Sequence, residues 1–320
     1  MSLVPASELR PLYGVSNTAS LAAIIGNVAC LALAIAAATH FDHLLVSIVA
    51  IIVIAARQHA LLVLAHEVAH RTLLTHRTLN DLAGELLTGA LFGDLASYRA
   101  DHLAHHAHLN TADDPDWART HDPDDDYHRQ WQLPMPAPRL FGIFARDLLG
   151  LSMHQLLRIV VRYSRVRRAR AQTETEQAPS ATKRAKATVI PGWVRLALYL
   201  GLFAALTLSG SWLAFLLYWF IPAMTGLRFI MRLRHMAEQF AIPSMGGGVC
   251  TRTVTAPPWQ RFLLAPHNVN FHAEHHLYPG VSFRRLPELH ELVRTHGGFE
   301  ADMHVSGDYV DVVRELSATS

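Results

Sequence analysis

The chain has 320 residues, of which 51% are hydrophobic and 17% are charged, and its mean hydropathy is +0.17. Soluble domains carry about a quarter charged residues, so this composition predicts a membrane protein and excludes a disordered chain. The net charge of +2 is mild, and we expect no nucleic-acid partner. Two cysteines are too few for a disulfide framework or a cysteine-based zinc site.

The first two apolar segments predict a helical hairpin. They cover residues 21–39 and 44–65, and at 1.5 Å per residue they are long enough to cross a bilayer. A chain that enters at residue 43 leaves the hydrocarbon core near residue 63. Arg57, Gln58 and His59 lie inside the second segment and must face protein or water, because polar side chains are costly in lipid.

The polar stretch after this hairpin contains three weaker features. Residues 82–97 are apolar but short, and they predict one interfacial or re-entrant helix rather than a further span. Residues 141–163 mix aliphatic and charged side chains, a pattern typical of a helix that lies in the membrane interface. Residues 165–186 are basic and Ser/Thr/Glu-rich, which predicts a solvated loop beside anionic headgroups.

A second apolar pair, residues 193–209 and 212–230, predicts another hairpin and gives four spans in total. Segment 66–192 carries 16 Lys and Arg residues and segment 231–320 carries 8, whereas the turns inside the hairpins carry none. The positive-inside rule therefore predicts that both polar segments and both termini are cytoplasmic. We expect an all-α integral membrane protein in which residues 1–320 form one domain, with a cytoplasmic helical cap.

Histidine is unusually frequent, with 21 residues, and eight of these form three short clusters. Residues three and four apart share one face of a helix, so each cluster can direct its imidazoles at a common point. Because the clusters lie in the segments expected under the membrane, all three can converge there. The eight histidines are His66, His70, His102, His105, His106, His272, His275 and His276.

Neutral imidazole is the commonest metal ligand in proteins, and eight imidazoles exceed the four ligands of one tetrahedral zinc ion. The clusters therefore predict two metal ions with open coordination positions. Imidazole suits iron, zinc, copper and nickel, so the residues alone leave the metal open.

These clusters and their surroundings resemble the membrane fatty acid desaturase family, whose three histidine boxes read H-x3-H, H-x2-H-H and H-x2-H-H. The similarity extends to His105-His106-Ala107-His108-Leu109 before Asp113-Asp114-Pro115-Asp116, and to the run from Asn268 to Gly280. It covers roughly residues 57–290. Relatives include acyl-lipid desaturases, hydroxylases, ketolases and bacterial enzymes that act on rhizobitoxine-type metabolites.

The resemblance implies a di-iron centre in which the eight box histidines are ligands. It further implies that Asn268 can hold a metal, either directly or through water. Relatives often have a ninth histidine where this chain has Gln239, and His235, one turn earlier, is a candidate replacement. Carboxylates beside the boxes, namely Glu67, Asp101, Asp113 and Glu274, are candidates for orienting the ligands by accepting an imidazole N–H.

The activity that the resemblance implies is desaturation of an acyl or lipid-like substrate by a di-iron oxidoreductase that uses O2. Hydroxylation, ketolation or another C–H oxidation on a lipid or a small metabolite remains open. No fused electron-carrier module is visible, so we expect a separate donor, which is a ferredoxin, a rubredoxin or a b-type cytochrome. The expected location is a bacterial inner membrane.

Two other classes compete with this interpretation. His66-Glu67-Val68-Ala69-His70 also satisfies H-E-x-x-H, the motif of zinc metalloproteases, in which Glu67 would be the general base. That alternative leaves two boxes unexplained. A metal transporter or sensor is the third class, and it predicts ligands that line the spans rather than ligands below them.

Overall fold

The first predicted hairpin is present in the computed structural model, which describes residues 3–121, 126–155, 190–242, 251–298 and 303–318. It consists of α2 (Asn17–Phe41) and α3 (Leu44–His70). Ser16 begins α2, because its side chain accepts a hydrogen bond from the Ala19 amide. Asp42 ends it in the left-handed region, at φ 41°. Helix α3 continues five residues past the predicted end of the second apolar segment, and the first histidine box forms its last turns.

The second predicted hairpin begins with α10 (Gly192–Ser209) and turns at Gly210, whose φ of 66° favours glycine. The returning helix runs from Trp212 to Gln239, nine residues beyond the predicted end of the last span. It is assembled from consecutive pieces, with a π turn in η3 and a bend at Thr225. These pieces are α11 (Trp212–Phe215), η3 (Leu216–Phe220), α12 (Ile221–Met224) and α13 (Gly226–Gln239).

The four long helices bury their apolar residues very unequally. In the most apolar stretch of α3, 67% of the residues are buried by neighbouring helices, whereas none are buried in α10. Large apolar side chains such as Leu196, Phe203 and Leu213 are exposed, as expected for a surface that lipid covers. Within the described residues, four helices are long and apolar enough to cross a membrane, which confirms the all-α membrane architecture.

Polar side chains in the middle of α3 face protein, as predicted. Arg57, Gln58 and His59 are all buried. Arg57 donates to the Phe262 carbonyl, and the Gln58 amide donates to the Trp219 carbonyl at 2.8 Å. These bonds tie α3 to the fourth long helix and to the C-terminal segment.

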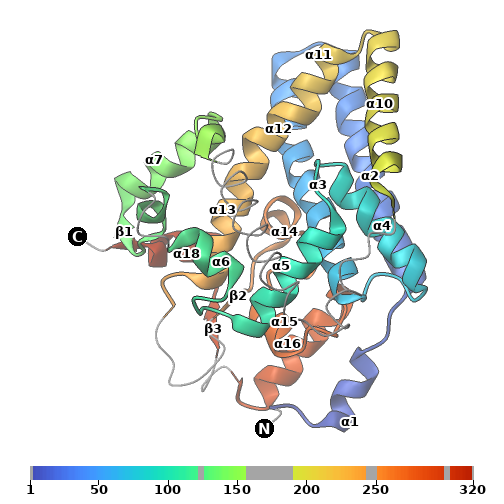
Figure 1. The fold of residues 1–320 in the computed structure, drawn as a ribbon. Helices are drawn as coiled ribbons and strands as arrows, with labels where there is room; N and C mark the ends of the chain where they lie inside the picture. The colour runs from blue at the N-terminus through green and yellow to red at the C-terminus, as the bar shows by residue number, and fades with distance from the viewer. Residues whose placement is uncertain (1–2, 122–125, 156–189, 243–250, 299–302, 319–320) are drawn as a thin grey trace, which may run out of the picture.

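A cap of shorter helices surrounds the histidine-bearing end of the two hairpins (Figure 1). The prediction of one short helix over residues 82–97 is wrong, because the chain turns between Gly89 and Asp94 and makes two helices. Asp94 begins the second of them by accepting from the Ser97 amide at 2.8 Å. The cap before the second hairpin contains α4 (Arg77–Gly89), α5 (Leu95–His108), α6 (Pro115–Thr120), η2 (Asp126–Trp131) and α7 (Ala137–Leu148).

The interfacial helix predicted over residues 141–163 corresponds in part to α7. The structure begins this helix earlier and ends it at Leu148, before a turn in which Gly150 has a φ of 70°. Residues 156–163 and the predicted loop at 165–186 lie outside the described residues.

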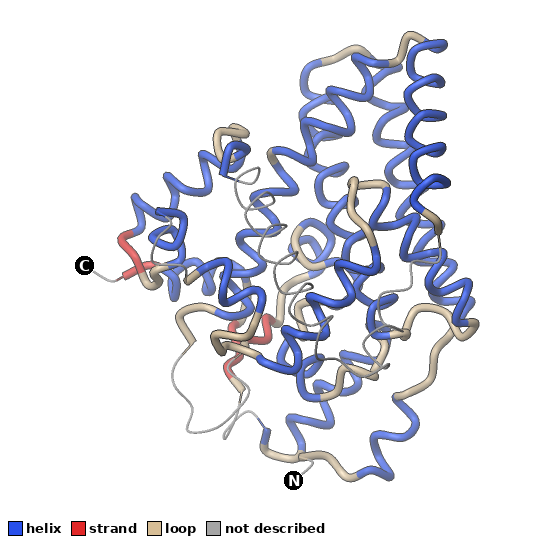
Figure 2. Tube along the Cα trace, in the orientation of Figure 1, coloured by secondary structure: helices blue, strands red, loops and turns tan. Residues whose placement is uncertain are grey.

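The C-terminal part adds helices to the cap and contributes to two short parallel strand pairs, whose strands are red in Figure 2. Strand β1 (Met135–Pro136) pairs with β4 (Ser317–Ala318), and β2 (Arg252–Val254) pairs with β3 (His304–Ser306). The helices of this part are α14 (Pro258–Leu263), η4 (Pro266–Asn268), α15 (His272–Leu277), η5 (Phe283–Arg285), α16 (Leu286–Thr295) and α18 (Tyr309–Leu316). Near the N-terminus, α1 (Ala6–Leu9) and η1 (Arg10–Leu12) pack their leucines into the same core as α16.

Candidate metal centre

The three histidine boxes lie on three helices, which meet where α3 ends. The first box ends α3, the second occupies the last two turns of α5, and the third forms most of α15. Glu67 links the first box to the C-terminal part, because its carboxylate accepts from Thr72 Oγ1 at 2.7 Å and from the Phe283 amide at 2.9 Å. The segments are distant in the sequence, yet their imidazoles face one another, as predicted.

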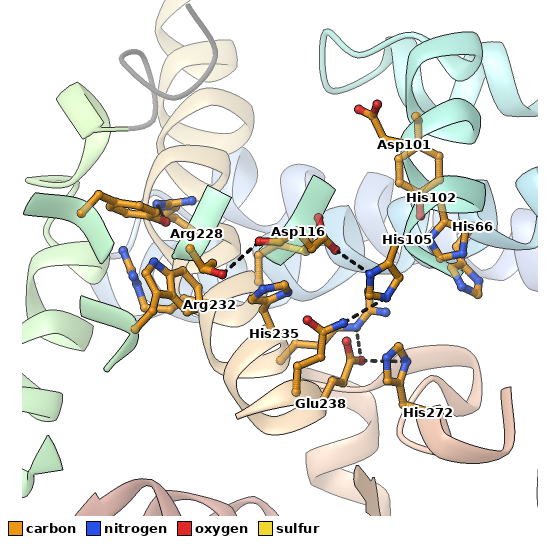
Figure 3. A pocket seen from close by; sticks show the side chains of 17 residues that line it. His66, Asp101, His102, His105, Asp116, Arg228, Arg232, His235, Glu238 and His272 are labelled. Carbon is orange, nitrogen blue, oxygen red and sulfur yellow. Dashed lines mark hydrogen bonds and ion pairs between the residues drawn. The ribbon is translucent and has the colours of Figure 1, made fainter. Parts of the chain in front are cut away.

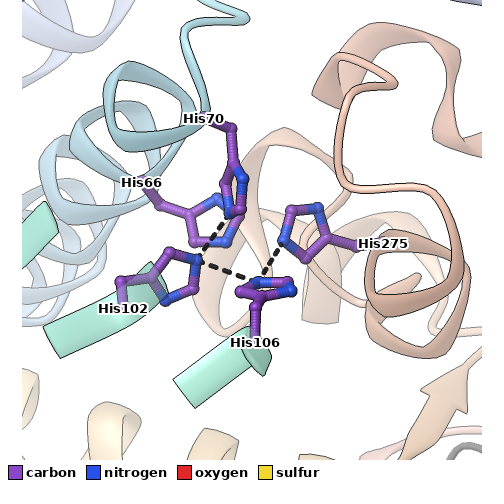
Figure 4. A group of neighbouring side chains, drawn as sticks. All are labelled: His66, His70, His102, His106 and His275. Atoms are coloured by element: carbon purple, nitrogen blue, oxygen red, sulfur yellow. Dashed lines mark hydrogen bonds between the residues drawn. The ribbon is translucent and has the colours of Figure 1, made fainter. Parts of the chain in front are cut away.

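Five of these histidines form one group, which we call the five-histidine group (Figure 4). One ring nitrogen from each residue lies within 4.8 Å of the others. The closest pair is His70 Nε2 and His102 Nε2, at 2.6 Å, and His106 Nε2 lies 3.1 Å from both His102 Nε2 and His275 Nε2. The members are His66, His70, His102, His106 and His275.

The remaining three box histidines, His105, His272 and His276, form the three-histidine group, again within 4.8 Å. The side-chain amide of Gln239 lies beside this group and donates to His105 Nε2 at 3.0 Å. Each H-x2-H-H box is therefore divided between the groups. In both boxes the two histidines four residues apart stay together, and the middle one points to the other group.

The electrostatic environment keeps most of these imidazoles neutral. Burial, together with repulsion between neighbouring imidazoles, lowers the pKa of His272, His275 and His276 well below 6.5. The same causes lower the pKa of His106 to about 3. A neutral imidazole has a free lone pair, which is the form that binds a metal ion.

His105 differs because a buried carboxylate holds it. Burial alone would lower its pKa, but the hydrogen bond to Asp114 and the charge of Asp116 raise it above 6.5. Both carboxylate oxygens of Asp114 lie 3.0 Å from His105 Nδ1. This contact orients the ring and leaves Nε2 toward the three-histidine group, an arrangement typical of a carboxylate behind a metal-binding histidine.

The residues present fit metal ions. Both ring nitrogens of His66 and of His272 are buried and lack a hydrogen-bond partner in the described part of the chain. Buried polar atoms without partners are costly, and here they lie in groups that several other imidazole nitrogens approach. A metal ion in each group would provide a partner for one of the two nitrogens of each ring.

Two further predicted site residues lie outside both groups. The ring of His235 packs against Trp131 and Phe240, with centroids 5.1 and 5.6 Å away. The Asn268 amide joins η4 to its neighbours, because its Oδ1 accepts from Arg261 and its Nδ2 donates to the Phe283 carbonyl at 2.9 Å. Two side chains of α13 contact the three-histidine group, namely Gln239 at His105 Nε2 and Glu238, whose carboxylate lies 3.6 Å from His272 Nδ1.

The predicted carboxylates have different partners. The Glu67 carboxylate lies 3.4 Å from His66 Nδ1, and Glu274 accepts from His290 and Thr253 rather than from a box histidine. Asp113 is exposed, and the residue that contacts His105 is its neighbour Asp114, which the sequence analysis missed. The available signal was the Asp-Pro pair, because Asp114 also begins α6 by accepting from the Asp116 amide at 2.8 Å.

A cavity of about 300 Å³ adjoins both groups (Figure 3). His66 and His102 of the five-histidine group form part of its wall, and so do His105 and His272 of the three-histidine group. Asp101, the fourth predicted carboxylate, also lines it. A molecule in this cavity would contact both groups.

Comparison with known proteins agrees with this arrangement. The family model described as fatty acid desaturase matches residues 42–303, which include all three boxes. Dihydrorhizobitoxine desaturase from Bradyrhizobium elkanii is 25% identical over 257 residues, which cover 78% of this chain and 68% of that protein. Because the family model matches most of the chain, and the four long helices and histidine groups agree with it, this protein belongs to the fatty acid desaturase family.

Proposed function

We propose that this chain is a membrane di-iron oxidoreductase that uses O2 and external electrons to desaturate its substrate. The observation that supports this most directly is the convergence of eight imidazoles in two adjacent groups beside a cavity. Family membership supports an oxidoreductase activity. An unactivated C–H bond needs a redox-active metal, which zinc is not, and the proposal of iron rests on the family to which the chain belongs.

In this proposal the eight box histidines hold two iron ions, which would supply the O2-derived oxidant that removes hydrogen from the substrate. The residues of the chain have positioning roles. Asp114 orients His105, and Glu67 fixes the end of α3 to η5, the helical turn before α16, through the Phe283 amide. From α13, Gln239 contacts His105 and Glu238 lies beside His272 in the three-histidine group.

The topology extends the proposal to the membrane. The hairpins would cross a bacterial inner membrane, with both termini and the metal centre on the cytoplasmic side, as the Lys and Arg distribution predicts. Electrons would come from a separate ferredoxin, rubredoxin or b-type cytochrome that docks on that side. We propose an acyl or lipid-like molecule as the substrate.

The metalloprotease alternative is not supported by the position of Glu67. A general base of that mechanism must reach a metal-bound water. Here the Glu67 carboxylate is 2% exposed and accepts hydrogen bonds from Thr72 and Phe283. In addition, the two histidines of the first box lie with three further histidines in the five-histidine group, whereas a protease needs a single further ligand.

Metal analysis of the purified protein tests the proposal. We expect two iron ions per chain in the wild type, and about one in His105→Ala, because this change removes a ligand from the three-histidine group only. His296→Ala is the matched control, since His296 is partly exposed and pairs with Glu8 far from the site. One zinc ion per chain, or two iron ions retained in His105→Ala, would contradict the ligand assignment.

Product analysis then separates the chemistries. Membranes that contain the protein and a reduced donor would be given candidate substrates, and the products measured by mass spectrometry. Loss of two hydrogen atoms indicates desaturation, whereas gain of one oxygen atom indicates hydroxylation. Turnover that continues without O2 or without any electron donor would overturn the proposed reaction.

A further inference from the structure

The end of the cavity away from the histidines is formed by two arginines of α13, Arg228 and Arg232 (Figure 3). Both pair with Asp147 of α7. Arg232 makes two hydrogen bonds to this carboxylate, and Arg228 Nε lies 3.8 Å from its Oδ1. Asp147 is the single carboxylate that either guanidinium contacts within the described residues. Two positive charges therefore share one negative charge.

The two guanidinium groups and the carboxylate that they share are largely shielded from water. The side chain of Arg232 is 1% exposed, that of Arg228 is 16% exposed and that of Asp147 is 1% exposed. Removing a charge from water is costly unless an opposite charge compensates it. Within the described residues, one guanidinium charge therefore lacks a matching anion.

Unpaired donors lie at the same place. Arg232 Nη1 and Arg228 Nε are buried and make no hydrogen bond to any part of the chain that the structure describes. The Arg228 Nη2 group is already bonded to the Tyr127 hydroxyl at 3.0 Å, which holds that side chain in place. The Arg232 guanidinium is 5.0 Å from the ring centre of Trp131, and this contact positions it in the same way. Fixed guanidinium groups with free donors are suited to a planar anion such as a carboxylate.

The cavity wall combines aromatic rings with several charged or polar side chains. The rings are those of Tyr98, Tyr127 and Trp131, and the charged or polar side chains include Asp116, Arg234 and Glu238. A long acyl chain here would desolvate these groups without giving them partners, which costs free energy. A volume of about 300 Å³ is at the small end of ligand pockets.

The spacing along α13 gives the length of a matching ligand. Arg232 and Gln239 are seven residues apart, which corresponds to about 10 Å along the helix axis. Gln239 marks the metal end, because it bonds to His105. A ligand held at the arginines therefore needs only a short chain to reach the histidine groups.

We propose that this cavity binds a small carboxylate, whose anionic group pairs with Arg228 and Arg232 while its C–H bonds face the two histidine groups. The assignment of the C–H end rests on the proposed function. The assignment of the anionic end does not, because it depends only on charge and hydrogen bonding. Binding and turnover can therefore be tested separately.

Isothermal titration calorimetry on the purified, iron-loaded protein without reductant measures the binding alone. The probes are hexanoate, its neutral analogue hexanamide, hexadecanoate and inorganic phosphate. We expect hexanoate to bind at least about 10-fold more tightly than hexanamide, since a charged hydrogen bond is worth about 1.5–3 kcal/mol. Arg228→Met should weaken hexanoate binding by a similar factor, and Arg228→Gln provides a second variant if Arg228→Met does not fold.

Arg146→Met is the matched control, because Arg146 is the neighbour of Asp147 on α7 but is exposed and does not line this cavity. It should leave hexanoate binding unchanged. Equal binding of hexanoate and hexanamide, no binding of hexanoate, or unchanged affinity in the Arg228 variants would overturn the proposal. If phosphate binds more tightly than hexanoate, the two arginines form a phosphate site instead of a carboxylate site. If hexadecanoate is the only probe that binds, the substrate is a long acyl chain. Binding without turnover would reject the proposed function and retain the site.

Discussion

Replacing Asp147 with asparagine removes one negative charge from the buried contact between α7 and α13 and leaves the side-chain shape almost unchanged. Asp147 accepts two hydrogen bonds from Arg232 and one from Ser152, and it lies 3.8 Å from Arg228. Asparagine can still accept one of these bonds through its carbonyl oxygen. The change therefore tests the charge rather than the packing.

The expected loss of stability is large, because both arginines would then lack an anion. Removing one partner of a buried ion pair costs about 3–5 kcal/mol. Glu291 and Arg294 form a comparison pair on α16, where both side chains are about 60% exposed. Exposed pairs contribute at most about 1 kcal/mol, so Glu291→Gln should have almost no effect.

Thermal unfolding of the purified variants in the same detergent measures this difference. Since 1 kcal/mol corresponds to about 2–4 °C for a domain of moderate size, a loss of about 3–5 kcal/mol in Asp147→Asn should lower the melting temperature by roughly 6–20 °C. Glu291→Gln should stay within about 4 °C of the wild type. If both variants melt together with the wild type, the two arginines are not buried cations that depend on Asp147, and the charge argument for the carboxylate site fails.

Two further predictions concern the packing around α3. Burial and the charge of Arg57 lower the pKa of His267 to about 4, so between pH 4 and 6.5 the unfolded chain binds a proton that the folded chain does not. Stability should therefore fall as the pH falls through 6.5. His267→Asn should reduce the slope of unfolding free energy against pH by about 1.4 kcal/mol per pH unit, and asparagine tolerates the φ of 56° at this position. An unchanged slope would reject this role of His267. Gly226→Ala should destabilise the protein by about 1–3 kcal/mol, because the new methyl group would lie 2.7 Å from the Ala55 Cβ atom. Gly201→Ala in α10 is the control, since it meets nothing within 4 Å, and equal melting temperatures of the two variants would exclude close packing at Gly226.

The sequence predicts the hairpins well because membrane spans are set by local composition. An uninterrupted apolar run must become a helix in lipid, whatever the rest of the chain does. The ends are less predictable, since α3 and α13 continue where protein contacts replace lipid. The turn between α4 and α5 was missed for a related reason, because an apolar run that is buried against protein does not show where the helix breaks.

The histidine boxes could be placed on helices from their spacing, but their division into two groups could not. Helical periodicity puts His102, His105 and His106 on one face, and it does not distinguish two targets a few ångströms apart. The division depends on how α5 lies against α3 and α15. Asp114 had a local signal, because the Asp-Pro pair marks the start of α6, but that signal does not report its contact with His105. Asp147 was missed because its arginine partners come from α13, so that no pattern within one segment reports the contact.

The length of α13 explains how these features are connected. This helix carries Arg228 and Arg232 to one end of the cavity and Gln239 to the other, beside His105. If the fourth span ended at Ile230, as its apolar run suggested, neither Arg232 nor Gln239 would have a helical position. Because all three residues belong to one helix, the distance between the proposed anchor and the histidine groups is held by backbone hydrogen bonds rather than by loops. A helix of this kind holds a ligand's reacting carbon at a constant distance from its anionic group, and positional selectivity in C–H oxidation depends on that distance.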